Sequence, residues 1–149
     1  MSPLISETNS SFKWFILATA TFVTMLYAMN VTIASIALSD MRGAMGATQD
    51  QISWVVTGNI VATAIFTPFA GWLSSRVQIR TILLFSVLGF IISSIFCGMS
   101  DSLEEIVIAR VAQGVFGAPL PPLSQTLVLA VFPKKQISVA MAIWGMGTI

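Results

Sequence analysis

The sequence predicts an all-α membrane protein with four transmembrane helices and the start of a fifth. Hydrophobic residues make up 56% of the chain and charged residues only 9%, whereas an ordinary soluble domain is about 25% charged. The apolar residues form long runs without the polar–apolar alternation of transmembrane β-strands. These two observations favour helices in a bilayer.

Four apolar runs are long enough to cross a bilayer, which takes about 20 helical residues. We expect spans at residues 14–38, 52–75, 81–100 and 106–132, after a polar tail at 1–13. A fifth run begins at residue 137 and stops at Ile149, too short to cross. Backbone groups left unpaired in lipid are costly, so we expect these residues to begin a longer polytopic protein.

Charges between the runs set the expected orientation. One side carries the bases Lys13, Arg76, Arg80, Lys134 and Lys135. The other side carries the acids Asp40, Asp50, Asp101, Glu104 and Glu105, with Arg42 as its flanking base. Basic residues collect in the cytoplasm. The prediction is a multi-pass cell-membrane protein with a cytoplasmic amino terminus and a cytoplasmic tail at 1–13. In the outer loop, Thr48 and Gln51 have the spacing of a helix capping box.

Several function classes are disfavoured by composition. Histidine is absent and Cys97 is the one cysteine, which excludes an intrachain disulfide and argues against a metal site. A net charge of +1 gives no sign of nucleic-acid binding. We find no nucleophile–base pair and no phosphate loop, so we expect neither an enzyme nor a cofactor.

Arg110 interrupts the fourth run and requires an explanation, because a charge at mid-bilayer costs about 2.5–3.5 kcal/mol on insertion scales. It lies about one turn inside the span, so its guanidinium can snorkel to the outer headgroups. Against that, Arg110, Gln113, Gly114 and Gly117 share one helix face. Small residues permit close helix contact and polar ones find partners across it. We therefore expect this stripe to face a helix bundle.

Three prolines follow the stripe, at positions 119, 121 and 122. Each lacks an N–H group and disturbs the preceding turn, so we expect the fourth span to bend or loosen there. Such irregular backbone fits either a kinked packing helix or a helix that lines a cavity, and the prolines alone do not decide between them.

Three segments resemble the major facilitator superfamily, in particular its fourteen-helix drug:proton antiporters. "RVAQGVFGAPLPPLSQ" resembles the fourth-helix motif R-x-x-Q-G-x-x-x-A, with Arg110, Gln113, Gly114 and Ala118 at its positions. "NVTIASIAL" resembles the first-helix motif, and "SWVVTGNIVATAIFTPFAGWLSSR" the second helix. The resemblance implies a major-facilitator-type helix bundle, of whose transporter domain residues 14–149 would be the amino-terminal part.

The resemblance also implies a function. It would be proton-driven export of amphipathic drugs or other small molecules by alternating access, in a bacterial inner membrane. The implied partners are those substrates, protons, the lipid bilayer and a periplasmic adaptor protein. The alternative from another class is a small four-helix assembly or scaffold protein that transports nothing. A small dimeric drug exporter would need a membrane carboxylate, and the spans contain none.

The candidate site residues follow partly from this resemblance and partly from polarity. The transport pathway would contain Arg110 and Gln113, and we also place the polar residues Asn30, Thr32 and Asn59 near its cavity. Close helix packing would use Gly114, Gly117 and Ala118. A cytoplasmic gate loop would contain Gly71, Ser75, Arg76 and Arg80. The polar residues Asn30, Thr32 and Asn59 also fit plain interhelical hydrogen bonding.

Two acids of the family pattern are missing. Asn30 replaces the first-helix Asp, and Ser75 replaces the Asp of the loop after the second helix. We place every acid of the chain in a tail or a loop, whereas proton antiport needs a titratable group within the membrane. Either the coupling carboxylate lies in another part of the protein, which we favour, or coupling is altered or lost.

Overall fold

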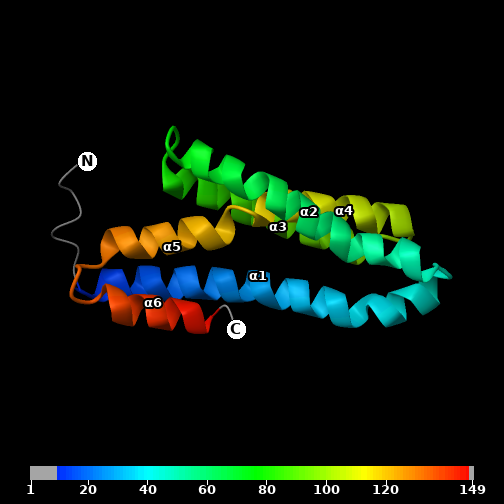
Figure 1. Cartoon of the computed structure of the whole chain (residues 1–149), viewed down its shortest axis with the longest axis horizontal. Helices are drawn as coiled ribbons and strands as arrows, with labels where there is room; N and C mark the ends of the chain where they lie inside the picture. The colour runs from blue at the N-terminus through cyan, green and yellow to red at the C-terminus, as the bar shows by residue number, and fades with distance from the viewer. Residues whose placement is uncertain (1–9, 148–149) are drawn as a thin grey trace.

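The structure, a computed structural model, describes residues 10–147 as helices joined by short connections (Figure 1). The helices are α1 (Ser10–Met45), α2 (Gln49–Ser74), α3 (Ile79–Met99), α4 (Leu103–Gly117), α5 (Leu120–Val131) and α6 (Ile137–Met146). Four stretches are long and apolar enough to cross a membrane: 11–43, 49–74, 79–99 and 103–131. The predicted all-α fold with four spans and the start of a fifth is confirmed.

The first helix extends beyond the apolar run at both ends. Its 36 residues give a length of about 54 Å, whereas the hydrocarbon core is about 30 Å thick. Residues 10–13, which we assigned to the tail, are therefore part of α1, and the remainder of that tail lies outside the described residues. The helix stops before Gly46, whose φ of 61° lies in the left-handed region that glycine adopts most readily.

The acids lie mainly on helix ends, so their placement in loops was largely wrong. Asp40 is on the last part of α1 and Asp50 is in the first turn of α2. Glu104 and Glu105 occupy the first turn of α4. Carboxylates near a helix amino terminus complement its positive dipole end, which explains three of these four positions.

The predicted capping box at the start of α2 is confirmed. The Thr48 hydroxyl oxygen accepts a 3.3 Å hydrogen bond from the Gln51 backbone N–H. In return, Gln51 Oε1 accepts a 3.0 Å bond from the Thr48 backbone N–H. The two bonds satisfy donors that the first turn of a helix leaves without partners.

The fourth span is broken in its middle, as the prolines predict. We expected one bent helix over 106–132, but α4 ends at Gly117 and α5 begins at Leu120. Pro119 has no N–H to continue the α4 ladder. Pro121 and Pro122 fall in the first turn of α5, where a missing N–H removes no helical bond.

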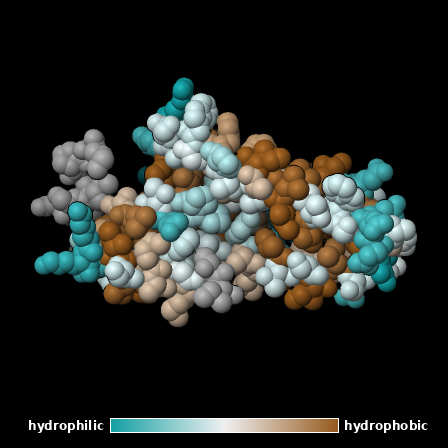
Figure 2. Space-filling model, in the orientation of Figure 1, coloured by the Kyte–Doolittle hydropathy of each residue, from teal (hydrophilic) through white to brown (hydrophobic). Residues whose placement is uncertain are grey.

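The two halves of this span pack against different helices. The first half, α4, makes its main contacts with α2 and α3, and the second half, α5, packs mainly against α1. The α2–α3 and α5–α6 connections lie at the same end of the bundle as the start of α1 (Figure 1). The five bases of the expected cytoplasmic side therefore gather at one end, which we call the basic end. In the face that Figure 2 shows, hydrophilic residues lie at both ends of the molecule, and hydrophobic patches lie between them among residues of intermediate hydropathy.

Candidate functional site

A polar cluster centred on Arg110 joins three helices. The Arg110 Nη1 atom donates hydrogen bonds to Asn30 Oδ1 on α1 at 2.8 Å and to Gln113 Oε1 at 2.7 Å. Gln113 lies three positions further from the start of α4 than Arg110, about 4.5 Å by the helix rise. The guanidinium is therefore held among the helices and is not directed toward the start of α4.

Gln113 connects this cation to α3. Its side chain is completely buried, at 0% exposure, and its Nε2 donates a 2.7 Å bond to Ser94 Oγ. Ser94 in turn donates to the Phe90 carbonyl at 2.8 Å. Because a glutamine amide both accepts and donates, this chain of bonds runs from α1 through α4 to α3 and fixes the orientation of the amide.

The positive charge of Arg110 has only neutral acceptors in the described part of the chain. Both Nη1 bonds go to amide oxygens, and the buried Nε atom makes no hydrogen bond. Within residues 10–147 no carboxylate reaches salt-bridge distance of the guanidinium. Arg110 is partly buried, and a cation removed from water is stabilised fully only when it is paired and hydrogen-bonded, so this site favours an approaching anion.

Asn59 belongs to the helix contact and does not face open space. Its side chain is 7% exposed and donates from Nδ2 to the Arg110 backbone carbonyl at 2.9 Å. The cavity beside it, about 10 Å³, is too small for an organic substrate. Of its two interpretations, the structure therefore favours interhelical hydrogen bonding over a wall of the pathway.

Thr32 lies apart from the cluster. It is exposed on α1, and its hydroxyl donates to the Ala28 carbonyl of its own helix at 3.0 Å. Among the five predicted pathway residues, the structure thus brings together the side chains of Arg110, Gln113 and Asn30.

The small residues of the stripe allow neighbouring helices to approach closely. A Cβ atom on Gly114 would lie 2.5 Å from the Asn59 carbonyl oxygen of α2, and one on Gly117 would lie 2.6 Å from the Tyr27 ring of α1. Ala118 is 1% exposed. The stripe therefore faces helices, as the sequence indicated, and glycine is the residue that fits at both close contacts.

Three participants were not predicted from the sequence. Ser94 receives the Gln113 bond, and Thr63 on α2 donates to the Gly114 carbonyl at 3.3 Å. The hydroxyls of Thr63 and Tyr27 are 3.5 Å apart. Ser93 and Ser94 are adjacent in the sequence, and the pattern alone does not say which of them faces α4.

The predicted gate residues surround the α2–α3 connection at the basic end. Gly71 and Arg80 lie on helices, so the connection itself is shorter than expected and comprises residues 75–78. Ser75 donates to the Trp72 carbonyl at 2.6 Å, and the Arg76 guanidinium lies 4.7 Å from the centre of the Trp72 ring. Arg76 thus has a cation–π partner, while Ser75 contributes no charge.

Comparison with known proteins identifies the family. Residues 20–149 match the Major Facilitator Superfamily. The chain belongs to this superfamily. The family resemblance of its motifs is thereby confirmed, and its membrane helices are those of a transporter family.

Three similar proteins illustrate the likeness. The multidrug export protein EmrB of Escherichia coli is 41% identical over 126 residues, 85% of this chain and 25% of EmrB. The probable multidrug resistance protein EmrY of E. coli is 35% identical over 91% of this chain and 27% of EmrY. The fatty acid resistance protein FarB of Neisseria gonorrhoeae is 35% identical over 81% of this chain and 24% of FarB. This major facilitator chain thus spans about a quarter of the length of these relatives.

Proposed function

We propose that this chain forms part of a secondary active transporter that exports small amphipathic compounds from the cytoplasm by alternating access, driven by protons. The names of EmrB, EmrY and FarB, all concerned with export or resistance, support this assignment. The collection of bases at one end supports a cytoplasmic amino terminus, and we place the protein in a bacterial inner membrane. A periplasmic adaptor protein is a further proposed partner.

The observation that carries the proposal is the Arg110 cation held among helices by neutral amides. A guanidinium stays protonated in proteins, so Arg110 does not itself carry the coupled proton. It acts on another group, because an opposite charge within about 4–6 Å favours the ionised form of a carboxyl. We assign the proton-carrying carboxylate to the part of the protein beyond this chain.

The remaining roles follow from the geometry. Gln113 and Asn30 orient the guanidinium toward the pathway. Arg76 and Arg80 line the cytoplasmic gate, and Ser75 makes a weaker latch there than the Asp of the family pattern, since a hydroxyl carries no charge. Gly114, Gly117 and Ala118 keep the helices close enough for these contacts.

Export by variants of Arg110 tests the proposal. Cells that produce the intact protein are loaded with a fluorescent amphipathic dye, and efflux is measured at matched protein levels in the membrane. We expect Arg110→Ala and Arg110→Lys to abolish export, because neither side chain reproduces two directed bonds from one planar cation. Arg42→Ala is the matched control, since Arg42 is an exposed arginine that bonds Gln49 at 2.6 Å.

Two results would overturn the proposal. Normal efflux by Arg110→Ala would show that the buried cation has no part in transport. Efflux that continues unchanged when an uncoupler collapses the proton gradient would show that transport is not proton-driven, and the missing acids at positions 30 and 75 would then explain the loss of coupling.

A further inference from the structure

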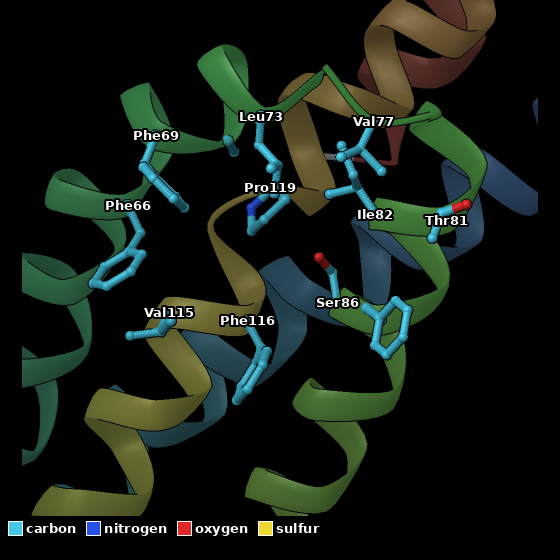
Figure 3. Close-up of a pocket in the computed structure, with 12 residues that line it drawn as sticks. Phe66, Phe69, Leu73, Val77, Thr81, Ile82, Ser86, Val115, Phe116 and Pro119 are labelled. Carbon is cyan, nitrogen blue, oxygen red and sulfur yellow. The ribbon is translucent and has the colours of Figure 1, made fainter. Parts of the chain in front are cut away.

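An apolar groove, separate from the polar Arg110 cluster, lies between α2, α3 and α4 toward the basic end. It is a groove of about 330 Å³, within the about 300–1,000 Å³ range of ligand sites. Its walls include four phenylalanines: Phe66, Phe69, Phe85 and Phe116 (Figure 3). Phe69 is 51% exposed and Phe85 is 70% exposed. In the described chain the groove is therefore open on one side.

One polar side chain points into this apolar groove without a partner. Ser86, on the groove floor, is 4% exposed, and its hydroxyl makes no hydrogen bond within residues 10–147. Figure 3 shows this hydroxyl directed into the space between the helices. By contrast, the buried hydroxyls of Ser93 and Thr24 each donate to the carbonyl four residues earlier at 2.8 Å. The Ser86 hydroxyl is thus open to the groove and free to donate to a ligand with an acceptor oxygen at this point.

Two arginines adjoin, in the sequence, residues that line the groove at its end nearest the α2–α3 connection, although neither arginine is itself part of the lining. Val77 and Thr81 line the groove there, and they directly follow Arg76 and Arg80 in the sequence. The described acids are at the start of α2 and α4, near the end of α1 and in the α3–α4 connection, which is the opposite end of the bundle. Among the described residues, the end of the bundle nearest this part of the groove therefore carries arginines and no carboxylate.

The spacing along α3 matches the layers of a bilayer leaflet. Ser86 is six residues from Arg80, about 9 Å by the helix rise. The headgroup region on each side of the membrane is about 5–8 Å thick. If Arg80 meets a phosphate in the headgroup layer, Ser86 lies just inside the hydrocarbon boundary, at the depth of acyl ester oxygens.

We propose that this groove binds one anionic phospholipid of the cytoplasmic leaflet. Its phosphate and headgroup lie against Arg76 and Arg80, and an ester oxygen accepts the Ser86 hydroxyl proton in a hydrogen bond. One acyl chain lies along the four phenylalanines. This assignment rests on the proposed orientation and shares Arg76 and Arg80 with the proposed gate, but it is tested by lipid binding, which does not require transport.

Native mass spectrometry of the intact protein tests the assignment. The protein is purified, equilibrated with equal amounts of phosphatidylglycerol and phosphatidylcholine, and the retained lipids are counted. We expect one phosphatidylglycerol to be retained in preference to phosphatidylcholine. Each of Arg76→Gln and Arg80→Gln should reduce this preference about fivefold, because a basic residue near an anionic surface contributes about a factor of five. Lys134→Gln is the control, since it removes a charge at the same end of the bundle but away from the groove.

Two substitutions of Ser86 distinguish the contribution of the groove volume to lipid binding from that of the Ser86 hydroxyl. Ser86→Leu fills the groove floor and should eliminate retention of the lipid. Ser86→Ala keeps the space and removes the donor, so retention of both lipids should fall several-fold while the preference between them is unchanged. Ser86→Ala is also the variant to rely on if the larger side chain impairs folding.

Three outcomes would overturn the assignment. Equal retention of both lipids would show that Arg76 and Arg80 do not select a headgroup. No retained lipid would show that another segment of the protein covers the groove. A loss of preference in Lys134→Gln as large as in Arg80→Gln would show general surface attraction in place of a defined site.

Discussion

Arg110 on α4 donates a 2.8 Å hydrogen bond to Asn30 on α1, although 80 positions of the chain separate them. The contact joins a cation inside the bundle to a neutral amide at the position where the family pattern has an acid. The amide holds the guanidinium in place but leaves its charge unneutralised. The first prediction concerns this pair.

Asn30→Asp should strengthen the contact between α1 and α4. A carboxylate accepts a charge-assisted bond from the guanidinium, and bonds to charged groups contribute about 1.5–3 kcal/mol. We expect a higher midpoint of thermal unfolding for the purified protein in detergent. Asn30→Leu, which removes the acceptor at similar size, should lower the midpoint. If both variants shift it in the same direction, the Arg110–Asn30 bond is not what holds these helices.

Gln113→Leu should destabilise the bundle more than Ser94→Ala does. The first change removes an acceptor from a cation, with a cost of about 1.5–3 kcal/mol, and the second removes a bond between neutral groups, about 0.5–1.5 kcal/mol. Thermal unfolding of the two purified variants measures the difference. Equal shifts would mean that Arg110 finds another acceptor when Gln113 is replaced.

Gly114→Ala should disturb the contact between α4 and α2. The added methyl group would lie 2.5 Å from the Asn59 carbonyl oxygen, and overpacking of this kind costs about 1–3 kcal/mol. Gly98→Ala is the matched control on α3, because nothing lies within 4 Å of its added methyl group. We expect a lower unfolding midpoint for the first variant and an unchanged or higher one for the second. A lower midpoint for Gly98→Ala than for Gly114→Ala would show that the contact of Gly114 with α2 is not the tight one.

Thr48→Ala should loosen the first turn of α2. It removes the side-chain half of the capping box, at a cost of about 0.5–2 kcal/mol. Hydrogen exchange of the backbone amides at residues 49–52 should accelerate, while exchange in the middle of α2 stays slow. Thr48→Ser retains a hydroxyl and should behave like the unchanged protein. Faster exchange in Thr48→Ser as well would show that the methyl group, and not the hydroxyl, secures this turn.

Features encoded locally were predictable from the sequence. The spans follow from apolar runs, since a bilayer admits helices whose backbone groups are paired internally. The break between α4 and α5 follows from Pro119, whose missing N–H acts within one turn. The capping box between Thr48 and Gln51 was likewise predictable, because it depends on two residues that are three positions apart.

Features set by the contacts between helices were not predictable to the same degree. The Arg110 stripe indicates that one face of α4 is buried, but it does not say which residues of other helices meet it. Ser94, Tyr27 and Thr63 became visible as partners only in the folded bundle. The extension of α1 past Leu38 was missed for another reason, because the apolar run ends there while residues that support a helix continue.

The break at Ala118–Pro119 divides one span between two groups of helices. Its first half, α4, packs mainly against α2 and α3, and its second half, α5, packs mainly against α1. Any movement of one group relative to the other would change the backbone conformation at this break. Pro119 has no N–H group, so no helical hydrogen bond from that residue would have to be broken. A pivot of the fourth span would therefore lie at its centre, and the contacts of both its halves with neighbouring helices would be kept.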